Sequence, residues 1–313
     1  MRKRPLGETG LSVSELGLGT WGLSGDAYGP VVAEDQDAVI DRALALGITV
    51  FETADSYGKG EMEKRLGERL ASQSDLVIVT KVGTDRDAKP PRKRFDAAFI
   101  KEAVERSRER LKRDAIEVVL LHNPSLQGLE RPGTVEALAE LKEKKLIGAW
   151  GVSAGSLEVA KAALARGAEV LELAHNAFHQ RELKGLGDEL TAKKAGILAR
   201  SVLAHGLLSG HWPTTKQFPR GDHRRDRWTP DELKKRISQL STLRPSVTGG
   251  VPSLRAAALR FVLANPAVSS AILGPRNMIQ LDQLVREAGG EPYFTPEALA
   301  ALERRLDAAG IRA

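Results

Sequence analysis

The sequence contains no cysteine among its 313 residues. Disulfide bonds, iron–sulfur clusters and zinc sites built on cysteine are therefore excluded, and a reducing compartment suits such a chain. The sequence also lacks any run of about 18 apolar residues, so we expect no membrane-spanning helix. The basic start, Met1 to Pro5, leads into no apolar segment, which argues against a signal peptide. We therefore expect a cytoplasmic protein.

Acidic residues are fewer than basic ones, and the formal net charge is +6 at pH 7. Two short runs supply much of the excess, Lys89 to Arg94 and His223 to Arg227. Basic runs are one mark of nucleic-acid binding. Both runs contain Pro or Asp, however, and neither lies on a cleanly basic helix. We interpret them as solvated loops and expect no nucleic-acid partner, although a basic rim also concentrates a polyanionic cofactor.

Short apolar runs alternate with amphipathic segments along the chain. Two runs flank Gly7 and Gly10 near the N-terminus and predict a β-hairpin. A strand at 16–20 then starts a series of eight, each followed by a helix. The other expected strands are 48–51, 76–80, 116–121, 147–152, 170–173, 197–200 and 268–273, and the expected helices include 35–46, 100–111, 134–144, 157–165, 188–195, 253–264 and 278–287.

These strands are rich in Val, Ile and Leu with little polar alternation, as parallel strands buried on both faces are. Eight such units predict one (β/α)8 TIM barrel over 1–313, with the hairpin as an N-terminal cap. An open doubly wound sheet would need a glycine-rich turn and a helix after an early strand, and Gly17 and Gly19 lead to neither. The irregular stretch 205–250 is expected to form a long loop on the C-terminal face, where substrate pockets form.

Polar side chains stand at the ends of three consecutive strands. Glu52 and Tyr57 follow the second strand, Lys81 ends the third and His122 ends the fourth. In a barrel these ends meet at the active-site face. A phenol, with a pKa of about 10, serves as a proton donor at neutral pH, and we expect the Lys81 ammonium to lower the Tyr57 pKa. A carboxylate beside the lysine fixes its position, and a histidine beside the tyrosine orients a carbonyl oxygen.

A lone histidine or lysine at a strand end is more often structural. Four such residue types at consecutive strand ends are hard to explain by packing. The pattern therefore predicts a proton donor for an oxygen that has just received a hydride, and the hydride must come from a cofactor.

Several motifs in the sequence resemble those of the aldo-keto reductase family. They are LGETGLSVS at 6–14, LGLGTW at 16–21, TADSYG at 53–58, TK at 80–81, LLHNP at 120–124, WGVS at 150–153, GLLSG at 206–210 and VSSAILGPR at 268–276. The resemblance implies a hairpin-capped barrel that binds NADPH, with NADH possible, without a Rossmann domain. It also implies that Tyr57 is the proton donor, with Lys81, His122 and Glu52 as the other catalytic residues.

The same resemblance implies a cofactor groove and a substrate pocket. The expected cofactor-binding residues are Ser153, Glu172, Arg200, Ser201, Leu203, Gly206, Leu207, Ser209, Gly274, Arg276 and Gln280. Backbone N–H groups at the start of the last long helix suit a phosphate, and Arg276 suits the 2′-phosphate of NADPH. Trp21 resembles a pocket aromatic, and Trp212 and Trp228 are further candidates.

Five positions depart from the family pattern, and one of them is Leu284, which replaces an asparagine that usually meets adenine. Glu52 replaces the usual aspartate, Ala154 an asparagine and Glu172 a glutamine, while Arg200 stands where an aromatic ring often stacks on nicotinamide. A guanidinium plane also stacks. Asp55 is another nearby carboxylate, but we expect Glu52 to be the partner of the catalytic lysine.

The sequence thus predicts NADPH-dependent reduction of an aldehyde or ketone, with a small-molecule carbonyl as the partner. One alternative is NAD(P)-dependent oxidation of a sugar by the same site run backward. Another is a cofactor-binding regulatory protein with weak catalysis, which the departures at 52, 154 and 172 keep open. We expect no metal site, because His175 and His179 begin at a strand end without acidic partners in a metal-binding motif.

Overall fold

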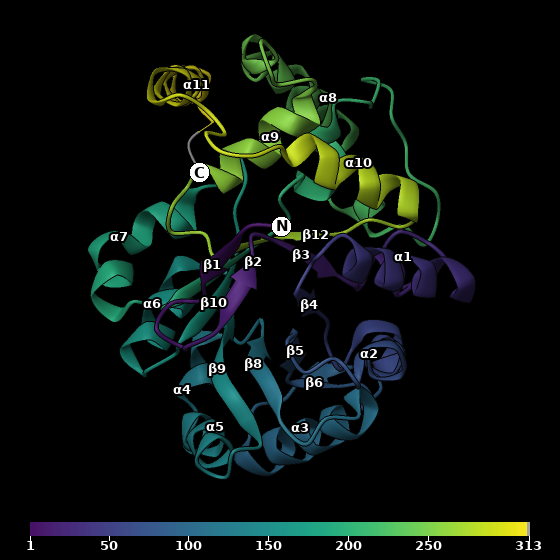
Figure 1. Ribbon diagram of the computed structural model, residues 1–313, viewed down its shortest axis with the longest axis vertical. Coiled ribbons are helices and arrows are strands. Elements are labelled where there is room, and N and C mark those ends of the chain that lie inside the picture. The colour runs from purple at the N-terminus through teal and green to yellow at the C-terminus, as the bar shows by residue number, and fades with distance from the viewer. Residues whose placement is uncertain (312–313) are drawn as a thin grey trace.

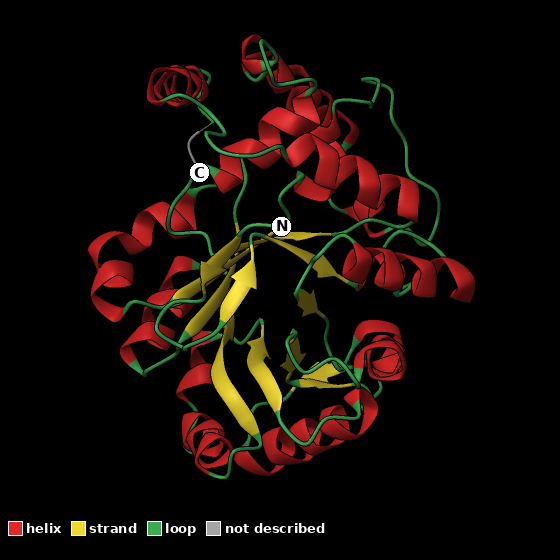
Figure 2. Ribbon diagram, viewed as in Figure 1, coloured by secondary structure: helices red, strands yellow, loops and turns green. Residues whose placement is uncertain are grey.

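Eight parallel strands form a closed barrel surrounded by helices in the computed structural model, which describes residues 1–311 (Figures 1 and 2). The expected (β/α)8 barrel is confirmed. In chain order the barrel strands are β3 (Leu16–Gly19), β4 (Val50–Glu52), β5 (Val77–Val82), β8 (Ile116–His122), β9 (Ile147–Ser153), β10 (Val170–Ala174), β11 (Gly196–Arg200) and β12 (Ser270–Leu273).

A helix follows each barrel strand and covers the outside of the sheet (Figure 2). These helices are α1 (Ala33–Ala45), α2 (Glu61–Leu70), α3 (Ala97–Leu111), α5 (Thr134–Glu143), α6 (Leu157–Ala165), α7 (Arg181–Lys193), α9 (Leu254–Leu263) and α10 (Met278–Ala288). The others are α4 (Leu126–Glu130), α8 (Pro230–Ser238) and α11 (Pro296–Ala308). No helix within residues 1–311 is long and apolar enough to cross a membrane.

Apolar side chains fill both faces of the barrel strands. Val77 and Val79 of β5 belong to the cluster inside the barrel, whereas Ile78 between them packs in the larger cluster that includes the helices. Successive strand residues point to opposite faces. Both faces are therefore buried, which explains why the strands read as continuous apolar runs.

The predicted hairpin pairs β1 (Lys3–Pro5) with β2 (Ser12–Ser14) in antiparallel register. Leu6 and Val13 are fully buried and join the cluster inside the barrel, so the hairpin closes that interior. Gly7 has a positive φ of 58°, and a side chain there would clash with the backbone at Lys194 and Gly196. A glycine is required for the cap to sit this close.

Two sequence predictions about the helices were wrong. The helix expected at 188–195 begins at Arg181, because the chain passes through a kink at Gly187 (φ 43°) that hides the first turns. The stretch 205–250 is not irregular throughout, since α8 lies within it. Thr229 and Glu232 form a capping box there and Pro230 occupies the first turn, a helix-start signal that the sequence analysis overlooked. A short hairpin of β6 (Thr84–Asp85) and β7 (Arg92–Lys93) was also missed.

Candidate active site

A cavity of about 760 Å³ lies at the C-terminal ends of the barrel strands. Most of the predicted site residues line it. They are Trp21, Glu52, Tyr57, Lys81, His122, Ser153, Glu172, Arg200, Ser201, Leu203, Gly206, Ser209, Gly274, Arg276 and Gln280. Leu207 does not line the cavity and is buried in the core. Trp212 lines the cavity, whereas Trp228 packs against the Trp212 ring at 6.2 Å without reaching it.

Lys81 is buried between two carboxylates. Its ammonium forms a close ion pair with Glu52 on the neighbouring strand and lies 3.5 Å from Glu172 Oε1 on β10. It also donates to the main-chain oxygen of Thr53 at 3.1 Å. Burial lowers the Lys81 pKa to about 8, although the charge of Glu172 opposes the shift.

The extra methylene of Glu52 has room because the facing residue on β3 is a glycine. A side chain at Gly19 would meet Glu52 Oε2 at 2.9 Å and the Ile272 side chain at 2.7 Å. Gly19 therefore permits a glutamate where the family pattern has the shorter aspartate.

Tyr57 lies in the turn that follows β4, and its ring stands nearly perpendicular to that of His122 at a centroid distance of 5.9 Å. Its hydroxyl donates a long hydrogen bond to Glu52 at 3.5 Å, and Lys81 Nζ lies 5.0 Å from the ring centroid. Burial and the negative charge of Glu172 raise the Tyr57 pKa well above its usual value. The expected lowering of the Tyr57 pKa was wrong, because burial and the charge of Glu172 outweigh the nearby positive charges.

His122 is held in its neutral form. Burial lowers its pKa well below the usual value, and the charges of Lys81 and Lys93 add to the effect. Its Nδ1 lies 3.4 Å from the Ser56 hydroxyl. One ring nitrogen of a neutral imidazole carries a proton, so His122 can donate one hydrogen bond toward the cavity.

Asp55 is separate from this cluster. Its backbone N–H donates to the Lys81 carbonyl at 3.0 Å, but its carboxylate makes no ion pair with that lysine. Burial and the nearby Glu63 raise the Asp55 pKa to about 7. The structure therefore pairs the lysine with Glu52, and the catalytic roles assigned to these residues stay predictions.

Three other positions that depart from the family pattern, Ala154, Glu172 and Arg200, lie at neighbouring strand ends on one side of the cavity. Arg200 donates to the Ala154 carbonyl at 3.2 Å. Arg200 Nε and Glu172 Oε2 are both buried without a hydrogen-bond partner. Buried polar atoms normally have partners. A donor and an acceptor thus remain for a polar ligand group between β10 and β11.

The start of α10 forms the end of the cofactor groove that is predicted to bind a phosphate. Its first turn is capped by Asn277, whose side chain accepts from the Gln280 N–H at 2.9 Å. The Arg276 guanidinium donates to the carbonyls of Gly29 and Pro30, both at 2.9 Å, while its Nε is buried without a partner. Arg276 is therefore already fixed by the loop after β3 and keeps further N–H groups for an anion.

Aromatic rings cover the other side of the cavity. Trp21 lies 5.5 Å from Tyr28, 4.7 Å from His223 and 6.2 Å from His205, measured between ring centroids. Burial lowers the His205 pKa to about 3, so this ring is neutral. Six residues that the sequence motifs did not indicate also line the cavity: Tyr28, His205, Arg86, Arg224, Arg227 and Arg255. Most come from loops, where no periodicity marks the residues that point inward.

Within residues 1–311 no group of three or more histidines and acidic residues is placed to hold a metal ion. His175 instead stacks on the Phe261 ring at 5.8 Å. His179 contacts Glu182 at 2.6 Å. The two histidines therefore have separate neighbours.

Known proteins share this sequence pattern and architecture. A match to the Aldo/keto reductase family spans residues 15–304. An uncharacterised oxidoreductase of Bacillus subtilis is 28% identical over 97% of this chain and 96% of its own length. L-galactose dehydrogenase of Arabidopsis thaliana is 28% identical over 90% of this chain and 86% of its own length.

A solved structure is similar over the whole fold. The holo form of an aldo-keto reductase from Bacillus halodurans has a TM-score of 0.81 and 27% identity, covering 97% of this chain and 96% of that one. The resemblance seen in the sequence motifs is confirmed. The chain belongs to the aldo/keto reductase family of NAD(P)H-dependent oxidoreductases.

Proposed function

We propose that this enzyme reduces an aldehyde or ketone to an alcohol with NADPH, and that Tyr57 donates the proton. One observation carries the proposal. The Tyr57 hydroxyl, the neutral His122 ring and the Lys81–Glu52 ion pair border a single cavity at the strand ends. A carbonyl oxygen in this cavity would meet a proton donor and a hydrogen-bond donor together.

The residues present fit a nicotinamide dinucleotide. The unpartnered Glu172 Oε2 suits the amide N–H of nicotinamide, and the unpartnered Arg200 Nε suits its oxygen. The start of α10 with Arg276 suits a phosphate, and the 2′-phosphate favours NADPH over NADH. When bound, the reduced cofactor supplies the hydride.

Each protein group has a defined task in reduction. Tyr57 keeps its proton at neutral pH because its pKa is raised, so it is ready to donate. Its phenolate forms beside the positive charges of Lys81 and Arg200, which stabilise it as the proton leaves. Glu52 holds the lysine in place. His122 orients the carbonyl oxygen through its single ring N–H.

Oxidation of a sugar by the same site is the second candidate, since one similar protein is named L-galactose dehydrogenase. Oxidation needs Tyr57 as a base, and therefore as a phenolate. Tyr57 carries its proton at neutral pH, so oxidation by this site is expected to need a higher pH than reduction.

The test is a cofactor titration followed by turnover. We expect NADPH to bind more tightly than NADH, and carbonyl substrates to be reduced faster at neutral pH than aldoses are oxidised. Faster aldose oxidation would favour the sugar dehydrogenase. Cofactor binding without turnover on any carbonyl or aldose would favour the regulatory alternative.

A further inference from the structure

We propose that the carbonyl substrate carries a carboxylate or phosphate group, bound by Arg86 and Arg227 at the mouth of the cavity. This inference rests on the proposed carbonyl reduction and names its substrate class. It starts from the charges around the cavity. The arginines that line it are Arg86, Arg200, Arg224, Arg227, Arg255 and Arg276, and the carboxylates are Asp26, Glu52 and Glu172.

Two of these arginines already have carboxylate partners outside the cavity lining. Arg224 binds Asp222 at 2.5 Å, and Arg255 binds Glu287 at 2.5 Å. Glu52 and Glu172 face Lys81. Asp26 accepts from the Gly58 N–H at 2.7 Å. The carboxylates that line the cavity are therefore engaged with other groups. None of them forms an ion pair with the remaining arginines of the lining.

Arg276 and Arg200 suit the cofactor, as described above, and both bind main-chain oxygens. Arg86 and Arg227 differ from them. In the described part of the chain neither guanidinium has a hydrogen bond or an ion pair, and both line the cavity. They come from different loops, after β5 and after β11.

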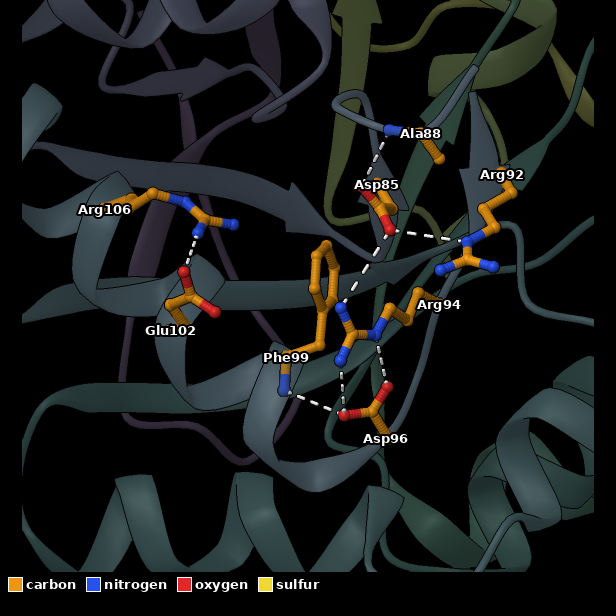
Figure 3. Close-up of polar contacts among 8 residues, drawn as sticks. All are labelled: Asp85, Ala88, Arg92, Arg94, Asp96, Phe99, Glu102 and Arg106. Atoms are coloured by element: carbon orange, nitrogen blue, oxygen red, sulfur yellow. Dashed lines mark hydrogen bonds and ion pairs between the residues drawn. The ribbon is translucent and has the colours of Figure 1, made fainter. Parts of the chain in front are cut away.

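Polar contacts join the residues on both sides of Arg86 in its loop. Asp85 accepts from the Ala88 N–H at 3.2 Å and from Arg92 Nε at 3.4 Å (Figure 3). Arg94 binds Asp96 at 2.7 Å and lies 4.0 Å from Asp85, with its guanidinium over the Phe99 ring (Figure 3). A larger groove, about 1240 Å³, runs beside Arg92 and Arg94, but these cations already have carboxylate partners.

Lys93 joins the same loop to the catalytic face. Its ammonium donates to the His122 carbonyl at 2.8 Å and to the Thr84 hydroxyl at 2.9 Å. The cations at 92, 93 and 94 thus hold the loop in place, while Arg86 is left free on a fixed support. An unpaired guanidinium that lines the cavity is well suited to a bidentate anion.

Arg227 approaches from the long loop. Its side chain is exposed and lies over the ring of Trp228, 5.6 Å from the centroid. Partial desolvation and the charge of Arg200 lower the Arg227 pKa. Like charges held near one another without a counter-ion are unfavourable, and an anionic ligand relieves that repulsion.

The arginines of this mouth, rather than His122 and His205, supply its positive field. Burial keeps His122 and His205 neutral by lowering their pKa values. Arginine stays charged throughout the physiological range. The preference for an anionic substrate is therefore expected to persist across neutral pH.

The experiment compares two aldehydes of equal chain length, 4-oxobutanoate and butanal, with glyceraldehyde 3-phosphate and glyceraldehyde as a second pair. We expect kcat/KM to be at least about tenfold higher for the anionic member of each pair, since a hydrogen bond to a charged group contributes that much. Arg86→Met and Arg227→Met should each reduce this ratio about tenfold, mainly through KM.

Two variants serve as matched controls. Lys89→Met and Arg225→Met remove exposed cations from the same two loops, away from the cavity lining. Both should keep the wild-type ratio. A ratio near one in the wild type, with good turnover, would overturn the inference and leave carbonyl reduction intact. Weaker NADPH binding in the Arg86 and Arg227 variants with an unchanged ratio would assign these arginines to the cofactor and also overturn it.

A binding measurement keeps the test independent of turnover. Succinate is titrated into the NADP⁺-loaded enzyme and followed by tryptophan fluorescence, because Trp21 lines the cavity. We expect saturable binding that Arg86→Met weakens and Lys89→Met does not. Binding of this kind without carbonyl turnover would support the anion site while contradicting the proposed function. No binding by the wild type would overturn the anion site.

Discussion

The ammonium of Lys81 lies 3.5 Å from the carboxylate of Glu172, a residue on a strand that is not its neighbour in the barrel. The ammonium also contacts Glu52, so it is held between two negative charges. The family resemblance implies a glutamine, a neutral amide, at the position that Glu172 occupies here. The carboxylate changes the electrostatics of the proposed proton donor, because Glu172 raises the pKa values of both Tyr57 and Lys81.

Replacing Glu172 with Gln is expected to move the basic limb of the kcat/KM profile to lower pH. The variant loses the charge that opposes the lowered Lys81 pKa, so this pKa falls below about 8. If the protonated lysine supports donation, activity is present below this pKa and is lost as pH rises through it. Glu158→Gln, an exposed change on α6, should leave the profile in place. A basic limb that stays or moves upward in Glu172→Gln would contradict this prediction.

Tyr57→Phe removes the proposed acid and keeps the ring. We expect kcat to fall by ~10²- to 10⁴-fold, the usual range for a general acid, while the Kd for NADPH stays nearly constant. Tyr28→Phe changes the other phenol of the cavity and should have a far smaller effect. Steady-state kinetics and cofactor fluorescence measure the two quantities. A kcat within severalfold of the wild type would show that Tyr57 is not the donor.

Glu52→Ala and Glu52→Asp test separately the charge of this carboxylate and the length of its side chain. The alanine variant leaves Lys81 with Glu172 alone, so the Lys81 pKa is expected to fall and proton donation to slow. The aspartate keeps the charge and restores the shorter side chain of the family, so activity should hold or rise. The pH–rate profiles of both variants are compared with that of Asp55→Asn. If Asp55→Asn shifts the profile and Glu52→Ala does not, the assignment of Glu52 is wrong.

The strand ends could be predicted from the sequence because barrel geometry brings them together whatever the loops do. Glu52, Lys81 and His122 are set by three adjacent parallel strands, and apolar runs located those strands. The direction of the Tyr57 pKa could not be predicted in the same way. It depends first on how deeply the phenol is buried and then on the charge of Glu172 across the barrel, and strand spacing alone reveals neither.

Loop residues escaped prediction for a different reason. Arg86 and Arg227 belong to segments without apolar periodicity, so nothing in the sequence indicates which cations face the cavity. The contacts of Arg276 are a related case. The motif suggested a free phosphate ligand, whereas the structure ties the side chain to the carbonyls at Gly29 and Pro30.

Arg276→Ala is expected to weaken NADPH more than NADH. A charge-assisted contact to the 2′-phosphate contributes roughly 1.5–3 kcal/mol, which is about a tenfold to hundredfold change in Kd. Loss of the bonds to the Gly29 and Pro30 carbonyls should affect both cofactors alike. Arg286→Ala, on the exposed side of α10, is the control. Equal losses for NADPH and NADH would show that Arg276 acts only by supporting the loop.

Asp55→Asn tests the buried carboxylate next to the catalytic strand end through stability. Burial and Glu63 raise the Asp55 pKa from 3.8 to about 7. Between these values the folded protein holds a proton that the unfolded chain has lost, so this residue makes stability fall as pH rises through that window. Asparagine has no charge to desolvate. The difference in Tm between variant and wild type should therefore shift in favour of the variant from about pH 5 to about pH 8.

Asp87→Asn removes an exposed carboxylate from the following loop and should show the same Tm difference at both pH values. A Tm difference for Asp55→Asn that does not change with pH would mean that Asp55 ionises without cost in the folded protein.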